Sequence, residues 1–277
     1  MKLKFHHAWS GLVLLCLHGL VAAQVSAARA EALMRKSGVW AQLADVAVQV
    51  KSGMSEATVG ERLTPDAIER LEQLVDDAFA PEQLRQTFLQ VLAQRVTPAQ
   101  GADALKWYDS PAGRLIAGLE EASSADFDDL NQVMAEGNQA FAKASLKRQA
   151  LLAQTVQATR AAEGMVTLQI NSTVAVMQGI ANVIPMETTP PAAELRKLLE
   201  AQRPQMLAST TGVLLSMFAL TYQTASDKAL QQYVKFLSSR SGVALSLAMM
   251  EALDQSLSNA ARLLGSAIPQ VPGTTRL

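Results

Sequence analysis

The chain has 277 residues and a mass of 29.6 kDa, with 49% apolar residues, 18% charged residues and a formal net charge of −1. This length and apolar content suffice for one or two folded domains, and they exclude a disordered chain, a collagen-like chain and a disulfide-stapled mini-protein. The weak and mixed charge gives no electrostatic basis for binding nucleic acid or an anionic membrane.

The first 23 residues have the pattern of a cleavable secretory signal. Lys2 and Lys4 form the positive start, residues 12–21 form an apolar run, and Val21-Ala22-Ala23 places small residues where a signal peptidase cuts. A second acceptable site follows at Val25-Ser26-Ala27. We therefore expect export to the periplasm, with cleavage after Ala23.

Cleavage would change the chemical inventory of the chain. The three histidines and the one cysteine lie in this segment, at His6, His7, Cys16 and His18. Without Lys2 and Lys4 the 24 basic residues become 22, against 25 acidic ones, so the net charge becomes −3. A chain without cysteine suits an oxidising compartment such as the periplasm.

Helix signals follow one another from residue 64. Thr64 is a predicted N-cap with Pro65 in the first turn, and Pro81 opens the next helix in the same way. Thr97-Pro98-Ala99-Gln100 is a capping box, and Asp109-Ser110-Pro111 ends that helix and starts another. The apolar positions expected to face inward are Ile68, Leu71, Val75, Ala78, Leu84, Phe88, Val91 and Leu92. Because hairpin signals are almost absent, we predict an all-α protein, a helical bundle with short turns.

An internal repeat relates the two halves of the chain at an offset of 129 residues. Residues 107–113, Trp-Tyr-Asp-Ser-Pro-Ala-Gly, align with residues 236–242, Phe-Leu-Ser-Ser-Arg-Ser-Gly. The same offset aligns the predicted N-cap Thr97 with Ser226, and the helix start at 80–81 with 209–210. We predict two pseudo-repeated multi-helix units.

The predicted organisation follows from the repeat and from the distribution of charge. Residues 24–163 carry 33 charged residues, whereas residues 164–277 carry 14. We divide the chain into a signal peptide (1–23), an N-terminal helical unit (24–163, repeat core 64–122), a charge-poor C-terminal unit (164–264, repeat core 193–253) and a flexible tail (265–277). A linker at 183–191 lies within the C-terminal unit.

Two stretches without any charge, 164–186 and 204–226, each have 23 residues, the length of a membrane span. Both contain several Ser, Thr, Asn and Gln residues, which are costly in hydrocarbon but usual in the central helix of a soluble bundle. We expect buried core rather than a membrane span, and association with a membrane remains the alternative.

Few catalytic chemistries remain for the mature chain. The absence of His and Cys excludes the Ser-His-Asp triad, the Cys-His pair and structural zinc sites. No Ser precedes a Lys by three residues, none lies in Gly-x-Ser-x-Gly, and no two glycines are closer than five residues apart, so the common serine nucleophile motifs and glycine-rich phosphate loops are missing. The acidic cluster Glu120, Glu121, Asp126, Asp128 and Asp129 does not fit a calcium loop, and we expect it to face solvent. We predict no catalytic residue, no metal and no cofactor.

The aromatic turn is the best candidate for binding. Trp107 and Tyr108 are adjacent on a helix and point about 100° apart. One interpretation makes Trp107, like its aligned Phe236, a core anchor while Tyr108 covers the turn. The other makes Trp107, Tyr108, Tyr233 and Phe236 the lining of a groove at the helix end, with Arg114 as its polar anchor.

The segment 104–114, Ala-Leu-Lys-Trp-Tyr-Asp-Ser-Pro-Ala-Gly-Arg, resembles the hallmark of the bacterial "domain of unknown function 2059" family, whose members are exported all-helical domains. The resemblance covers residues 81–121. The second copy departs from it, with Arg240 in place of the proline and Leu237 in place of the tyrosine. The resemblance implies export and an α-helical fold, and it brings no activity and no catalytic residue.

These observations favour a non-enzymatic interaction or accessory protein of the bacterial cell envelope, acting on an envelope protein partner and not on nucleic acid. The alternative is a periplasmic carrier of an apolar ligand, suggested by the charge-poor second unit and by Met206, Met217, Met249 and Met250. A carboxylate-based envelope hydrolase comes third. An interaction protein should have an exposed aromatic patch. A carrier should have an enclosed apolar cavity in residues 164–264. A hydrolase should have two carboxylates that face each other in a cleft.

Overall fold

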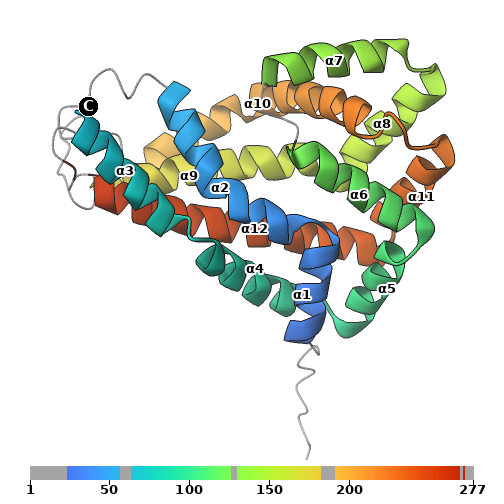
Figure 1. The fold of residues 1–277 in the computed structure, drawn as a ribbon, viewed down its shortest axis with the longest axis horizontal. Coiled ribbons are helices and arrows are strands. Elements are labelled where there is room, and N and C mark those ends of the chain that lie inside the picture. Colours follow the sequence, from blue (N-terminus) through green and yellow to red (C-terminus); the bar gives the residue numbers. More distant parts are fainter. Residues whose placement is uncertain (1–23, 57–63, 126–129, 182–190, 269–270, 272–277) are drawn as a thin grey trace, which may run out of the picture.

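The computed structural model describes residues 24–56, 64–125, 130–181, 191–268 and 271. Twelve α-helices and no strand run through these residues, which confirms the all-α prediction (Figure 1). The helices are α1 Ala27–Lys36, α2 Val39–Glu56, α3 Pro65–Ala78, α4 Pro81–Arg95, α5 Pro98–Tyr108, α6 Pro111–Ala125, α7 Leu130–Lys143, α8 Leu146–Thr159, α9 Ala161–Ala181, α10 Ala192–Thr221, α11 Asp227–Leu237 and α12 Arg240–Ala267.

The predicted helix starts are confirmed. The side chain of Thr64 accepts a hydrogen bond from the Ala67 amide at 3.3 Å, and α3 begins at the following proline. Thr97 and Gln100 form the predicted capping box in front of α5. Of the residues expected to face inward between 64 and 95, all are buried except Ile68, which is half-buried.

Helix α12 lies at the centre of the molecule and packs along α9 (Figure 1). Its 28 residues extend for about 42 Å, and α3, α4 and α5 also pack against it. On its other side α9 contacts α10, so it lies between two long helices. This position fits the composition of α9, in which Glu163 is the one charged residue, because charged side chains on its packed faces would be buried among apolar neighbours.

The backbones of α9 and α12 touch where two glycines face each other. A Cβ atom on Gly265 would lie 2.3 Å from the carbonyl oxygen of Val176, and one on Gly179 would lie 2.5 Å from the carbonyl oxygen of Arg262. Both distances are too short for any side chain. The close packing of α9 against α12 therefore depends on the absence of a side chain at these two positions.

No helix in the described residues is both long enough and apolar enough to cross a membrane. The first charge-free stretch forms most of α9, and its last residues, 182–186, lie outside the described residues. In the second stretch Pro204 lies inside the continuous helix α10. Most of the predicted linker and tail also falls outside the described part, apart from Pro191, the N-cap of α10, and residues 265–268 and 271.

The repeat corresponds to local structure in one region. Helices α5 and α11 each have 11 residues, begin after the aligned caps Thr97 and Ser226, and end in turns that start α6 and α12 at aligned positions. The predicted equivalence of 80–81 with 209–210 is wrong, because α4 starts at Pro81 whereas α10 runs unbroken through 209–210. The division into two repeated units remains a prediction.

We predict that Gly265→Ala lowers the free energy of unfolding by about 1–3 kcal/mol, because the new methyl group must push the backbones of α9 and α12 apart. Gly212→Ala, inside α10, is the matched control because a Cβ atom there meets nothing within 4 Å. This control gains about 0.5–1 kcal/mol from reduced backbone freedom. Urea unfolding followed by circular dichroism measures the free energy of unfolding of both variants. Equal effects of the two substitutions would contradict the close packing of α9 and α12.

Candidate functional site

The turns that follow α5 and α11 have the same construction. Asp109 and Ser238 cap the two helices with backbone angles of φ −80°, ψ −9° and φ −81°, ψ −7°. After them, the Ser110 hydroxyl accepts from the Gly113 amide at 3.0 Å and the Ser239 hydroxyl accepts from the Gly242 amide at 3.0 Å. Each serine therefore caps the helix that follows, α6 or α12.

Glycine is required three residues after each of these serines. A Cβ atom on Gly113 would lie 2.0 Å from the carbonyl oxygen of Trp107, and one on Gly242 would lie 2.0 Å from that of Phe236. The start of the second helix thus presses against the last turn of the first. This contact fixes the backbone of the residue that carries the aromatic ring.

The two rings fixed in this way stack on each other. Trp107 and Phe236 have ring centroids 5.0 Å apart and planes 9° apart, and Trp107 also stacks on Tyr233 at 5.9 Å and 5°. Tyr108 meets the ring of Phe236 edge-on at 6.4 Å. The structure therefore brings together four of the five residues proposed from the sequence as a binding site.

Arg114, the fifth, points elsewhere. Its guanidinium donates a hydrogen bond to the carbonyl oxygen of Asp109, so it closes the end of α5. It is not among the residues that line the neighbouring pocket.

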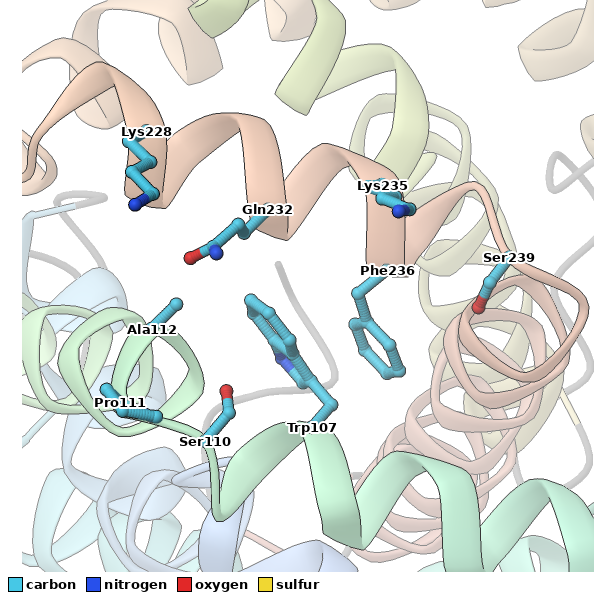
Figure 2. Close-up of a pocket in the computed structure, with 9 residues that line it drawn as sticks. All are labelled: Trp107, Ser110, Pro111, Ala112, Lys228, Gln232, Lys235, Phe236 and Ser239. Atoms are coloured by element: carbon cyan, nitrogen blue, oxygen red, sulfur yellow. The ribbon is translucent and has the colours of Figure 1, made fainter.

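An open pocket of about 660 Å³ lies between α11 and the turn from α5 to α6 (Figure 2). Its lining comes from the end of α5, the start of α6, α11 and the cap of α12, and consists of Trp107, Ser110, Pro111, Ala112, Lys228, Gln232, Lys235, Phe236 and Ser239. Figure 2 shows Trp107 rising from α5 towards α11, from which Lys228 and Gln232 extend into the same space.

The charge of this pocket has one sign. Lys228 and Lys235 carry positive charge, and the lining contains no carboxylate. Neither lysine forms an ion pair within the described part of the chain. Sequence reasoning missed Lys228, Gln232 and Lys235, although their spacing of four and three residues on one helix puts them on one face and would have been the signal.

One hydrogen bond at the equivalent place on the other side of the stack has no counterpart in the pocket. There the Ser241 hydroxyl of α12 donates to the carboxylate of Asp103 on α5 at 2.8 Å. At the same offset of 129 residues, Ala112 corresponds to Ser241 and Gln232 to Asp103. Ala112 has no hydroxyl group, so this bond cannot form, and both residues line the pocket instead.

The prediction that the acidic cluster faces solvent is wrong for Glu120, which lies beneath the aromatic stack. The hydroxyls of Tyr222 and Tyr233 both donate to its Oε1 atom, at 2.6 and 2.9 Å. Glu120 is half-buried, whereas its neighbour Glu121 is exposed as expected. The rest of the predicted cluster, residues 126, 128 and 129, lies outside the described residues.

Burial controls the titration of this network. It raises the pKa of Glu120 above its ordinary value, and the two tyrosine hydrogen bonds oppose that rise only in part. Burial and the nearby carboxylate also raise the pKa of Tyr222 and Tyr233 well above 10, so both remain donors at neutral pH. Burial, and to a lesser extent the charge of Glu120, raise the pKa of Tyr108 as well.

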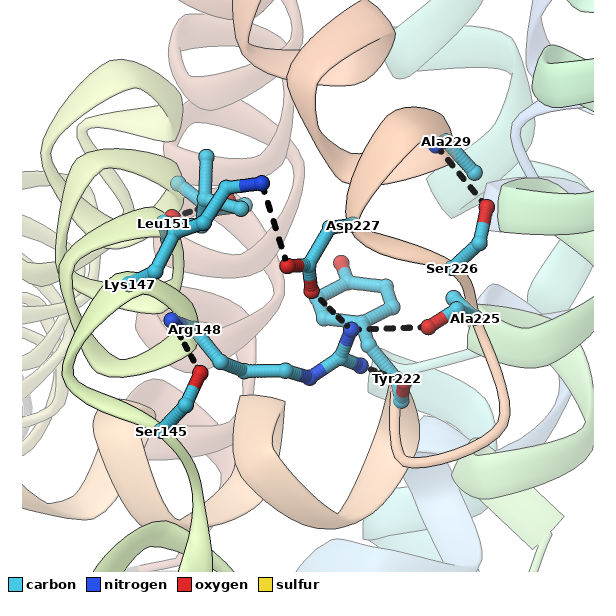
Figure 3. A network of polar contacts seen from close by, with 10 residues as sticks. Ser145, Lys147, Arg148, Leu151, Tyr222, Ala225, Ser226, Asp227 and Ala229 are labelled. Atoms are coloured by element: carbon cyan, nitrogen blue, oxygen red, sulfur yellow. Dashed lines mark hydrogen bonds and ion pairs between the residues drawn. The ribbon is translucent and has the colours of Figure 1, made fainter.

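Arg148 of α8 holds the connection between α10 and α11 in place (Figure 3). Its guanidinium donates to the carbonyl oxygens of Tyr222 and Ala225, and to the carboxylate of Asp227 at 3.0 Å. Lys147 adds a second ion pair to Asp227 at 3.6 Å. These contacts fix the first turn of α11, from which Lys228 extends into the pocket.

Two further surface pockets bear on the hypotheses of an apolar-ligand carrier and of a carboxylate-based hydrolase. An open groove of about 630 Å³, mostly apolar, lies between α2, α9 and α12 with Phe79 at its edge. A smaller pocket of about 300 Å³ includes Glu163, Glu251 and Asp254. Glu251 pairs with Arg95 at 2.6 Å, and Asp254 accepts from Asn171 with both oxygens at 2.8 Å, so these two carboxylates already have protein partners.

The comparisons with known proteins agree with the resemblance. Residues 82–140 match the family described as "Uncharacterized protein conserved in bacteria (DUF2059)", which confirms the similarity suggested by the aromatic turn. The matched segment extends from α4 into α7 and contains Trp107, Ser110 and Gly113. No curated protein and no solved structure matches the chain significantly.

We predict that Glu120→Gln makes the protein at least as stable as the wild type at pH 7, because the amide oxygen still accepts from both tyrosines and no charge is buried. Glu120→Ala leaves the two hydroxyls without this acceptor and costs about 1–3 kcal/mol. The raised pKa also gives a pH dependence. The folded chain binds a proton more tightly than the unfolded chain, so the stability contributed by Glu120 increases as the pH falls through the folded pKa and levels off below 4.5.

Urea unfolding at a series of pH values between 4 and 7 measures this effect as the difference between the wild type and Glu120→Gln. If the difference does not vary with pH, the titrating group is not Glu120. If Glu120→Ala is as stable as the wild type, the network does not hold α6 and α11 together.

Proposed function

We propose that this chain is an exported, non-enzymatic binding protein of the bacterial cell envelope, and that the pocket beside Trp107 receives an acidic segment of a partner protein. One observation carries the proposal. The rings of Trp107 and Phe236 adjoin Lys228 and Lys235, which form no ion pair within the residues that the structure describes, and the lining contains no carboxylate. Charge complementarity therefore favours a negatively charged partner.

The spacing of the cations suggests the form of the partner. Lys228 and Lys235 are seven residues apart on α11, so their backbones are separated by about 10.5 Å along the helix axis. A peptide in the polyproline II conformation has three residues per turn and advances about 3.1 Å per residue, so acidic side chains three residues apart lie on one face and span a similar distance, about 9.3 Å. An apolar or aromatic side chain between them can lie against Trp107, and Gln232 can bond to the peptide backbone.

Export is supported by the first 23 residues, which have the charge, apolar run and small residues of a signal peptide. The similarity to a bacterial family over residues 82–140 supports a bacterial source. Loss of the segment would leave a chain without His or Cys, and this suits a binding protein in an oxidising compartment better than it suits an enzyme.

The pocket also supports an origin by duplication. We infer that α5–α6 and α11–α12 derive from one ancestral helix pair, because their caps, turn angles and glycine contacts are alike. The Asp103–Ser241 bond closes one side, while Gln232 and Ala112 leave the other side open. On this proposal the binding site arose where the sequences of the two helix pairs, α5–α6 and α11–α12, became different.

The binding test uses tryptophan fluorescence. Trp9 lies in the segment proposed for removal, and Trp40→Phe leaves Trp107 as the one remaining tryptophan. We expect the acetylated, amidated tetrapeptide Glu-Ala-Phe-Glu to change this fluorescence, whereas Gln-Ala-Phe-Gln does so far more weakly. Lys228→Gln and Lys235→Gln each weaken binding about tenfold, because a hydrogen bond to a charged group contributes about 1.5 kcal/mol, and added salt weakens binding further.

A second pair of substitutions tests the pocket itself. Ala112→Ser with Gln232→Asp copies the Asp103–Ser241 bond and should abolish peptide binding while the fold stays intact. Gln231→Asp is the control, because it adds the same charge at the neighbouring exposed position outside the lining. Equal binding of the two peptides, or full binding by the closed variant, would show that the pocket does not select acidic segments.

The apolar groove between α2, α9 and α12 favours carriage of an apolar ligand as the second candidate function. The two functions predict different masses in native mass spectrometry of the mature chain purified from periplasmic extract without detergent. We expect the mass of the chain alone or of a protein complex. An additional mass of a few hundred daltons would favour the carrier, since that is the size of a ligand that such a groove can hold.

A further inference from the structure

The first described residues, 24–26, are part of the fold although they precede α1. Val25 is only 3% exposed and belongs to the largest buried apolar cluster. Its amide donates to the carbonyl oxygen of Val96 at 2.9 Å. Val96 directly precedes the capping box of α5, so residues 24–26 attach the segment in front of α1 to the junction between α4 and α5.

The side chain of Val25 lies against Gly101, in the first half of α5. A Cβ atom on Gly101 would come within 2.9 Å of Cγ2 of Val25, so the missing side chain makes room for the valine. Leu33 of α1 lies on the same side, since its Cδ1 would be 3.8 Å from that Cβ atom. Val25 therefore fills a gap that α1 and α5 leave between them.

Ser26 has a separate role at the start of α1. Its hydroxyl accepts from the Arg29 amide at 3.4 Å, and its carbonyl oxygen accepts from the Ala30 amide at 2.9 Å. It is thus the N-cap of the helix. Residues 24–26 combine a backbone hydrogen bond, a buried apolar side chain and a helix cap, and we name this segment the N-terminal latch.

The two cleavage sites allowed by the sequence have different consequences for the latch. Cleavage after Ala27 would remove Val25 and Ser26 and would place a new ammonium group on Ala28, in the first turn of α1. The partial positive charge of a helix N-terminus repels such a group. Cleavage after Ala23 keeps all three residues and leaves the new ammonium on Gln24, which is exposed.

We propose that the processing site of the precursor is the Ala23–Gln24 bond, and that the N-terminal latch holds α5 in the mature protein. The proposal rests on the export proposed above. A host signal peptidase supplies the catalysis: water adds across the amide bond, Ala23 leaves with a carboxylate, and Gln24 keeps the nitrogen as an ammonium group. The latch acts on the binding pocket because Gly101 and Trp107 lie on the same helix.

The full-length precursor, expressed in a bacterium and recovered from the periplasm, gives the first test. Intact mass and N-terminal sequencing should show a chain beginning at Gln24, with allowance for cyclisation of that residue. A chain beginning at Ala28 would overturn the processing site while leaving export intact. An uncleaved chain that stays in the cytoplasm would instead overturn export itself, so the two failures are distinguishable.

The second test separates the latch from the cleavage. Val25→Ala, in the chain that begins at Gln24, removes most of the buried side chain, and Gln24→Ala changes an exposed neighbour as the control. We expect Val25→Ala to increase amide hydrogen exchange in residues 97–105 by about tenfold and the control to leave it unchanged. Unchanged exchange in Val25→Ala, or equal effects of the two substitutions, would overturn the latch.

Discussion

The contact between each turn glycine and the carbonyl oxygen of the preceding aromatic residue is the constraint on which the candidate site depends. Only glycine fits at 113 and 242, because any side chain would lie 2.0 Å from that oxygen. The contact sets the direction of Trp107 and Phe236, and their stack joins α5 to α11. The pocket, the buried tyrosines and the Asp103–Ser241 bond all lie around this stack, so their geometry depends on two backbone positions.

The polar network behind the aromatic stack favours one arrangement of α6, α8, α10 and α11 over others. Two tyrosine hydroxyls bind one oxygen of Glu120, and Arg148 holds the connection between α10 and α11 from the other side. Satisfied buried hydrogen bonds stabilise one arrangement of helices, since any other arrangement leaves polar groups without partners. In this protein they fix the position of α11, which carries the two lysines and Gln232, so the pocket has a rigid wall on the proposed binding side.

The remaining chemistry favours binding over catalysis. In the small pocket, Glu251 and Asp254 are held by an arginine and an asparagine, whereas the lysines beside Trp107 have no ion pair in the described residues. A partner that brings its own carboxylates can pair with these lysines. The N-terminal latch contacts the helix that carries Trp107, since Val25 binds Val96 and packs against Gly101, and the proposed cleavage after Ala23 would keep these contacts.

Local signals in the sequence determined the helices. Thr64, Thr97 and the prolines that follow them set helix starts through hydrogen bonds and backbone angles that involve only neighbouring residues. The aromatic turn was predictable for the same reason, and the repeat indicated that Trp107 and Phe236 occupy equivalent positions. The tertiary structure decided which of the five proposed residues share a site. It turned Arg114 back onto the end of α5, placed the half-buried Glu120 against two tyrosine hydroxyls, and placed Lys228 and Lys235 beside Trp107. The bond from Arg114 to Asp109 spans five positions, whereas the surroundings of Glu120 and of the two lysines depend on contacts between residues more than 100 positions apart. No local pattern of caps or periodicity specifies such long-range contacts.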